Sequence, residues 1–161
     1  MTTRNYHLMK WIGFAVIIAF IDQITKYLAT ANLVYGDPYA LIPGVNLTLF
    51  HNTGAAFSFL ADQGGWQRWF FAILTTMVSL GLIVWLKFLS HEERATRIAI
   101  CLILGGAIGN LFDRLTWGYV IDFIQLYYSS WYWPIFNVAD ASITIGAVLL
   151  IFAGSHFEKA A

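Results

Sequence analysis

Residues 66–88 read WQRWFFAILTTMVSLGLIVWLKF, and this long apolar stretch decides the fold. Its charged residues, Arg68 and Lys87, lie near its two ends. A helix needs about 20 predominantly apolar residues to cross the roughly 30 Å of hydrocarbon in a bilayer. The sequence therefore predicts a transmembrane helix over residues 66–88.

Three further apolar stretches are long enough, or nearly long enough, to cross a bilayer. They lie at about residues 11–30, 98–112 and 138–154, and the first two of these are the weakest candidates. The 161 residues are 59% hydrophobic and 11% charged, with a mean hydropathy of +0.66. This composition is too apolar for a typical soluble domain. The sequence predicts a membrane protein of the all-α class, with four transmembrane helices in a single domain over residues 1–161.

The start of the chain permits a second interpretation. Arg4 and Lys10 precede the first apolar stretch, and the small residues 29–31 follow it, as in a cleavable signal peptide. Three polar residues interrupt the stretch before that candidate cleavage site, namely Asp22, Gln23 and Lys26. We therefore interpret the segment as a retained transmembrane helix.

The positive charges of the chain orient these helices. With the amino terminus in the cytoplasm, six lysines and arginines lie on the inner side and three on the outer side, which obeys the positive-inside rule. The inner ones are Arg4, Lys10, Lys87, Arg94, Arg97 and Lys159, and the outer ones are Lys26, Arg68 and Arg114. We expect both termini in the cytoplasm and two long outer segments, at about residues 31–65 and 113–137.

The two outer segments carry strand and turn patterns. Residues 45–50 alternate as in a short strand, and turn residues precede them at 42–44. Residues 120–127 and 131–136 are suited to form a hairpin around residues 129–130. Because both segments are rich in Leu, Ile, Tyr and Trp, we expect a small β-rich cradle that lies on the outer surface of the bilayer.

Charge and composition exclude several classes of function. The formal net charge is zero and no Lys/Arg-rich run occurs, so we expect no binding to nucleic acid. The four histidines are scattered, and no His/Cys group has the spacing of metal ligands. The single cysteine, Cys101, lies within an apolar stretch, where it packs most simply as a small hydrophobic residue. We expect neither a metal nor a cofactor.

Polar residues within the apolar stretches have structural as well as functional interpretations. Asp22 and Lys26 have the i,i+4 spacing of a favourable pair, and each alone would be costly in lipid. They fit a structural ion pair. Residues 105–109 read GGAIG, which predicts close packing between helices. Asn52 and Gly54 belong to a polar turn that, taken alone, indicates only a loop.

The polar residues near the third and fourth stretches leave similar alternatives open. Asn110, Asp113 and Arg114 share one helical face, and Arg114 is suited to cap a helix C-terminus. Asn137 precedes Asp140 by three residues, as in a variant capping box.

Asp122 differs from these residues, because no Lys or Arg neighbours it in its apolar run, residues 120–124. An unpaired buried carboxylate requires a partner or a shifted pKa.

These polar residues fall toward one face of the membrane. The set comprises Asp22, Lys26, Asn52, Asn110, Asp113, Arg114, Asp122, Asn137 and Asp140. A transporter usually places such groups near the bilayer midplane, so one outward-facing site is favoured. Two carboxylates in such a site can share a proton and activate a water molecule, as in aspartic peptide hydrolysis. The start of a helix favours the ionised form of Asp140, and Asp122 lacks that help.

Five motifs carry a resemblance to a known family. They are DQITK (residues 22–26), NTGAAF (52–57), GGAIGNLFDR (105–114), VIDF (120–123) and FNVAD (136–140). Each motif alone is weak, but five in this order are highly specific. Across nearly its whole length, the chain resembles the bacterial lipoprotein signal peptidases, also called signal peptidase II.

The resemblance implies a multi-pass aspartic protease of the bacterial inner membrane, with its active site facing the periplasm. Its substrates would be diacylglyceryl-modified prolipoproteins, cut just before the lipidated cysteine, and its other partner would be membrane lipid. We expect a monomer. By the same resemblance, Asp122 and Asp140 are catalytic, Asn52, Gly54, Asn110, Arg114 and Asn137 line the site, and Asp22, Lys26 and Asp113 hold its shape.

Two other functions remain as alternatives at this point. A small proton-coupled transporter or channel subunit would use the two carboxylates as a proton relay. An assembly or scaffold subunit would use its aromatic outer segments to bind another membrane protein. Cleavage of a lipidated prolipoprotein without any gradient would argue against the first alternative. Loss of function on a single Asp to Asn change would argue against the second.

Overall fold

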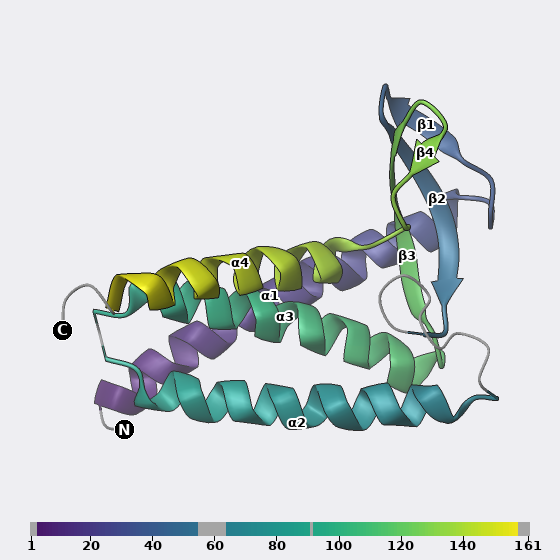
Figure 1. Cartoon of the computed structure of the whole chain (residues 1–161). Helices are drawn as coiled ribbons and strands as arrows, with labels where there is room; N and C mark the ends of the chain where they lie inside the picture. The colour runs from purple at the N-terminus through teal and green to yellow at the C-terminus, as the bar shows by residue number, and fades with distance from the viewer. Residues whose placement is uncertain (1–2, 55–63, 91, 158–161) are drawn as a thin grey trace.

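A computed structural model describes residues 3–54, 64–90 and 92–157 of the chain. Its helices are α1 (Thr3–Asn32), α2 (Trp66–Phe88), α3 (Arg94–Thr116) and α4 (Val138–Phe157). They lie side by side in a bundle, in which α3 packs against the other three (Figure 1). The start of α1 and the end of α4 lie at the same end of this bundle (Figure 1).

Three of the described helices are long and apolar enough to cross a membrane. They are Leu8–Asn32 within α1, all of α2, and all of α3, whereas the apolar part of α4 is shorter, Val138–Ala153. The helices α1 and α3 continue beyond the expected apolar stretches, 11–30 and 98–112, at both ends. At the end of α3, the polar residues Asp113 and Arg114 find partners within the protein.

The helices expose apolar side chains and bury polar ones. On α1 and α2, the side chains of Ile17, Phe20 and Met77 are 56%, 65% and 64% exposed. Asp22 and Lys26, in contrast, are at most 1% exposed. This inverted distribution is expected where lipid surrounds the helices, because a charged group in hydrocarbon requires partners inside the protein. The fold is that of a multi-pass membrane protein.

Close helix packing depends on the glycines of α3. A Cβ atom on Gly105 would lie 2.7 Å from the carbonyl oxygen of Ala15 in α1. One on Gly106 would collide with the carbonyl oxygen of Ala139 in α4, and one on Gly109 with the carboxylate of Asp22. The interpretation of residues 105–109 as a packing motif is confirmed. These contacts bring the polar parts of α1, α3 and α4 together.

The opposite end of the bundle is fixed by Arg97. Its guanidinium donates hydrogen bonds to the carbonyl oxygens of Leu89 (2.6 Å) and Ser90 (3.1 Å), just after α2. Because these carbonyl groups lie just beyond the last residue of α2, the cation gives them partners and joins the end of α2 to α3. Nearby, Cys101 is fully buried in an apolar cluster, as the sequence predicts.

A four-stranded antiparallel sheet stands at the end of the bundle where α1 ends and α4 begins (Figure 1). Its strands are β1 (Tyr39–Ile42), β2 (Val45–Asn52), β3 (Val120–Tyr128) and β4 (Trp131–Tyr132), in the order β1-β2-β3-β4. The predicted strand at residues 45–50 is confirmed as β2, and the predicted hairpin is confirmed as β3 and β4.

The sheet differs from the prediction in two details. The second arm of the hairpin was expected over residues 131–136, but β4 contains only Trp131 and Tyr132. The chain then leaves the ladder and returns to β3 at a single bridge between Phe136 and Ile124. β1 was not predicted, because its four residues, YALI, show no alternation of apolar and polar side chains.

A bulge in β2 sets which side chains face the site. Leu47 pairs with Ile124 and Phe50 pairs with Asp122, so β2 advances three residues where β3 advances two. Side chains alternate between the two faces of a strand, and one extra residue reverses that alternation. Asn52 therefore lies on the same face of the sheet as Asp122.

Candidate active site

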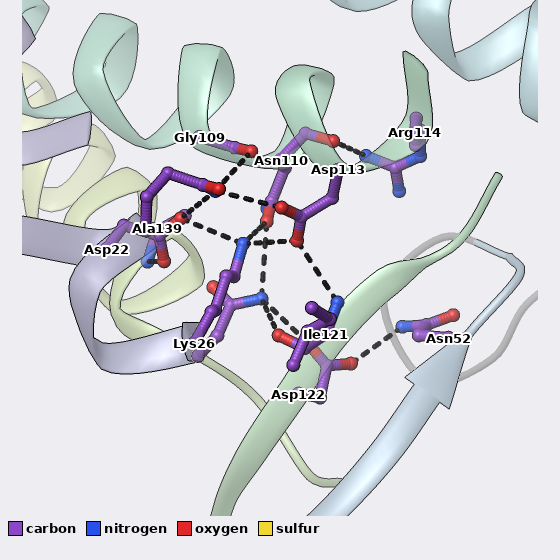
Figure 2. A network of polar contacts seen from close by, with 12 residues as sticks. Asp22, Lys26, Asn52, Gly109, Asn110, Asp113, Arg114, Ile121, Asp122 and Ala139 are labelled. Atoms are coloured by element: carbon purple, nitrogen blue, oxygen red, sulfur yellow. Dashed lines mark hydrogen bonds and ion pairs between the residues drawn. The ribbon is translucent and has the colours of Figure 1, made fainter. Parts of the chain in front are cut away.

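Lys26 occupies the centre of a buried polar network. Its ammonium group lies 2.8 Å from a carboxylate oxygen of Asp22 and 2.8 Å from one of Asp113. It also donates a hydrogen bond of 2.9 Å to the Oδ1 atom of Asn110 (Figure 2). The predicted Asp22–Lys26 pair is confirmed. Asp113 joins it from α3, so three ionisable side chains that are at most 1% exposed satisfy one another.

The two carboxylates of this network also fix backbone segments. Asp22 accepts a hydrogen bond of 2.9 Å from the backbone N–H of Ala139, in the first turn of α4. Asp113 accepts one of 3.1 Å from the backbone N–H of Ile121 in β3 (Figure 2). Since the first N–H groups of a helix lack partners within the helix, Asp22 acts as a cap supplied by another helix. α1 and α3 thus position the elements that carry Asp122 and Asp140.

Gln23 is a member of the network to which sequence reasoning assigned no role. Its Nε2 atom lies 2.8 Å from the Oδ1 atom of Asp113, 3.1 Å from the carbonyl oxygen of Gly109 and 3.2 Å from Oδ2 of Asp22. It therefore ties α1 to α3 beside the ion pairs. Its position within the first motif, between Asp22 and Lys26, was the available signal.

Asn137 links Asp122 to Asp140. Its Oδ1 atom accepts a hydrogen bond of 2.8 Å from the backbone N–H of Asp140, and its own N–H donates to the Asp140 carboxylate at 3.3 Å. This reciprocal pair confirms the predicted capping box. The Nδ2 atom of Asn137 also donates to Oδ1 of Asp122 at 2.6 Å. One fully buried residue therefore contacts both carboxylates, that of Asp122 through its side-chain amide and that of Asp140 through its backbone N–H.

Two further amides complete the environment of the carboxylates. Asn52 donates from Nδ2 to Oδ2 of Asp122 at 3.0 Å, and Asn110 donates from Nδ2 to Oδ1 of Asp140 at 2.8 Å. The Oδ1 atom of Asn52 accepts a hydrogen bond of 3.0 Å from the backbone N–H of Gly54. Each carboxylate is therefore held by two donors, which fixes the orientation of its oxygens.

The pKa of Asp122 is strongly raised. Burial disfavours its charged form and the negative charge of Asp140 adds to this effect, which raises the pKa of Asp122 to about 7. The hydrogen bonds from Asn52 and Asn137 and the charge of Lys26 act in the opposite direction. The prediction that Asp122 requires a partner or a shifted pKa is confirmed, and its hydrogen-bonding partners are amides.

Arg114 connects α3 to the segment that follows β2. Its Nη2 atom donates a hydrogen bond of 3.0 Å to the carbonyl oxygen of Gly54, and Nη1 lies 3.5 Å from the carbonyl oxygen of Asn110. Its guanidinium carbon lies 5.4 Å from the ring centre of Phe71 in α2, as in a cation–π contact. The helix-cap interpretation is therefore correct only in part, because the shorter hydrogen bond of Arg114 goes to Gly54, outside α3.

A cavity of about 550 Å³ opens beside these residues. Its polar lining comes from Asn52, Asn110, Arg114, Asp140 and Thr144. Its apolar wall includes residues 133–136, after β4, and Ile143 and Ile145 of α4. Sequence reasoning missed this wall, because ordinary apolar residues carry no signal of a binding surface. The size suits an extended peptide segment, and the mixture of lining residues is typical of a binding site.

The structure brings together all of the predicted site residues. The hydrogen bonds and ion pairs given above form one connected set that contains Asp22, Lys26, Asn52, Gly54, Asn110, Asp113, Arg114, Asp122, Asn137 and Asp140. Residues 55–57 of the second motif lie outside the described residues.

A comparison with protein families identifies the chain. The family model described as signal peptidase (SPase) II matches residues 14–155, which contain all of these polar residues.

The chain belongs to the signal peptidase II family.

Individual relatives agree with this assignment. The lipoprotein signal peptidase of Acinetobacter baumannii is 48% identical over 95% of this chain and 87% of its own length. That of Hydrogenovibrio crunogenus is 51% identical over 86% of this chain and 81% of its own length. A solved structure described as a bacterial membrane enzyme has a TM-score of 0.80 and 35% identity, and covers 89% of this chain and 86% of its own. As a signal peptidase II, the chain is a multi-pass membrane protease.

Proposed function

We propose that this signal peptidase removes signal peptides from diacylglyceryl-modified prolipoproteins by aspartic catalysis, cutting before the lipidated cysteine. The family and the relatives support proteolysis of prolipoproteins. The observation that carries the catalytic type is that one buried residue, Asn137, contacts both carboxylates, that of Asp122 through its side-chain amide and that of Asp140 through its backbone N–H. No serine or cysteine enters the hydrogen bonds of this site as given above, whereas two carboxylates that share a proton are suited to activate water.

In this mechanism the two carboxylates have different roles. Asp140, which lines the cavity, accepts a proton from a water molecule as the water oxygen adds to the scissile carbonyl carbon. Asp122, whose raised pKa keeps a proton near neutral pH, donates it to the carbonyl oxygen. Collapse of the resulting tetrahedral species returns that oxygen's proton to Asp122. The amine of the cysteine leaves with the proton held by Asp140, and the signal peptide keeps the new carboxylate.

The same proposal includes the topology and the location of the protein. We assign α4 as the fourth transmembrane helix of one peptidase domain, with both termini in the cytoplasm of a bacterial cell and the site at the periplasmic side of the inner membrane. The start of α1 and the end of α4 share one end of the bundle, and the sheet stands at the other (Figure 1). One chain supplies both carboxylates, so the protein is expected to act as a monomer.

The proposed function is tested with purified protein in liposomes that carry no ion gradient. We expect cleavage of a diacylglyceryl-modified prolipoprotein, with mass spectrometry placing the cut directly before the lipidated cysteine. A transporter or channel subunit, the earlier alternative, would not cleave it. Absence of cleavage by protein that is folded and inserted would overturn the proposal.

The pH dependence of cleavage is expected to report the proton on Asp122. Because the pKa of this group is raised to about 7, it is protonated below that pH and ionised above it. We expect kcat/KM to fall as the pH rises through about 7, by about tenfold for each further unit.

The hydrogen bond from Asn52 lowers the pKa of Asp122, so Asn52→Ala is expected to move this decline to higher pH. Profiles of kcat/KM from about pH 5 to about pH 9 measure the decline in wild type and its shift in Asn52→Ala. A shift to lower pH in Asn52→Ala would contradict the assignment.

Arg114→Ala is expected to weaken substrate use more than it weakens the fold. The guanidinium lines the cavity, where it can donate to substrate carbonyl groups as it does to Gly54. Loss of one charged hydrogen bond costs about 1.5 to 3 kcal/mol, so kcat/KM should fall by about 10- to 100-fold. Arg68→Ala is the matched control. Arg68 bonds the carbonyl oxygen of Leu115 at 2.7 Å and is not part of the lining of that cavity. Equal losses of activity and of unfolding temperature in both variants would favour a structural role for Arg114.

A further inference from the structure

Lys26 uses its full donor capacity on three different partners. A lysine ammonium group has three N–H bonds and no acceptor. Its three partners here are Oδ2 of Asp22, Oδ2 of Asp113 and Oδ1 of Asn110, all between 2.8 and 2.9 Å from Nζ. Two of these are carboxylates that balance its charge. The third is a neutral amide, and that amide belongs to a residue that contacts Asp140.

The contacts of Asn110 define which end of its amide faces Asp140. Oδ1 accepts from Nζ of Lys26 at 2.9 Å and from Nδ2 of Asn137 at 3.2 Å. Nδ2 donates to Oδ1 of Asp140 at 2.8 Å. A rotation of the amide by half a turn would place its NH₂ group against the ammonium and its oxygen against the carboxylate. Both new contacts would be repulsive, so the charge of Lys26 selects the orientation in which Asn110 donates to Asp140.

We propose that Lys26 is a positioning residue for proteolysis, which acts on Asp140 through the amide of Asn110. This inference rests on the proposed aspartic function. Lys26 contacts neither carboxylate of the catalytic pair in the hydrogen bonds and ion pairs of the described residues. Its effect on catalysis passes through Asn110, which lines the cavity beside Asp140.

The neighbouring carboxylates, Asp22 and Asp113, do not depend on Lys26 alone. A positioning role of Lys26 can therefore be separated from a role in holding the fold together. Asp22 also accepts from the backbone N–H of Ala139, and Asp113 from that of Ile121. Gln23 lies within hydrogen-bond distance of both carboxylates. The fold therefore keeps several links between α1, α3 and α4 when Lys26 is replaced. In contrast, the Oδ1 atom of Asn110 would lose its only charged donor among the described contacts.

The test removes Lys26 without changing the net charge of the buried cluster. Lys26→Met alone would leave two carboxylates that are fully buried facing one another. The double variant Lys26→Met/Asp113→Asn removes one positive and one negative charge, and its reference is the single variant Asp113→Asn, in which Lys26 still holds Asn110. We expect kcat of the double variant to be about 10²-fold below that of the reference, with KM within about threefold, because a misplaced catalytic group lowers turnover and not substrate binding.

Arg97→Met is the matched control for loss of a buried cation. Arg97 is 6% exposed and lies in the part of α3 that is remote from Asn110 along the helix. We expect this variant to lower the unfolding temperature but to keep kcat within about twofold of wild type.

The outcomes of this test are distinct. A double variant with the kcat of Asp113→Asn would overturn the positioning role, as would a double variant that does not fold where Asp113→Asn folds. If wild type itself fails to cleave prolipoprotein, the proposed function is wrong.

Discussion

Asp122→Asn and Asp140→Asn are each expected to lower kcat for prolipoprotein cleavage by at least about 10³-fold, while the protein stays folded and inserted. Either change removes the single proton that the pair shares, since an amide neither accepts nor releases a proton at neutral pH. Shape is largely kept, because the new amide oxygen can accept one of the two hydrogen bonds that each carboxylate receives. Cleavage assays and thermal unfolding in detergent measure the two effects separately.

A matched control is available in Asp37, an exposed aspartate of the first outer segment. Asp37→Asn makes the same change from carboxylate to amide in the segment that precedes β1. It is expected to keep kcat within about twofold of wild type. The double variant Asp122→Asn/Asp140→Asn should be no slower than either single variant, because the two groups act as one unit. Turnover near that of wild type in either single variant would refute the catalytic pair.

Local patterns predicted the parts of the site that lie close together in the sequence. The i,i+4 spacing identified the pair of Asp22 and Lys26, and the spacing of Asn137 and Asp140 identified the capping box. Span length and hydropathy identified the helices, because the bilayer fixes how many apolar residues a helix needs. The isolation of Asp122 in an apolar strand indicated its raised pKa.

The parts that were not predicted depend on contacts between distant segments. Asp113 pairs with Lys26 across 87 positions of sequence, and no local periodicity relates them. The bulge in β2 has no marker such as glycine or proline between Leu47 and Phe50, yet it decides that Asn52 faces Asp122. Their predicted placement at one membrane face and the family resemblance assigned Asp113 and Asn52 to the site, but only the fold shows which residues they contact.

Removal of the diacylglyceryl group from the substrate is the other change with a large expected effect. Lipid chains gain about 0.8 kcal/mol for each CH₂ group that they bury. The cavity has an apolar wall that includes Trp133, Ile143 and Ile145, and the side chains of Trp133 and Ile145 are 43% and 54% exposed. Around the same end of the bundle, Trp66, Trp69 and Trp117 are more than half exposed, which is typical of residues at the membrane interface.

These features predict that lipid holds the cleavage site at the depth of Asp122 and Asp140. The signal peptide itself inserts into the bilayer, so the substrate is bound to the membrane even without lipid. The lipid chains are expected to fix the depth of the cleavage site. We expect kcat/KM for an unlipidated precursor to be at least about 10²-fold lower than for the diacylglyceryl form, because misplacement of the reacting atoms by about 1 Å has an effect of that size. Flotation with liposomes confirms that both precursors are inserted before their rates are compared. A precursor with one acyl chain should be cleaved at an intermediate rate, since it buries fewer CH₂ groups. Equal rates for inserted precursors with and without lipid would show that the peptide alone sets the position of the scissile bond.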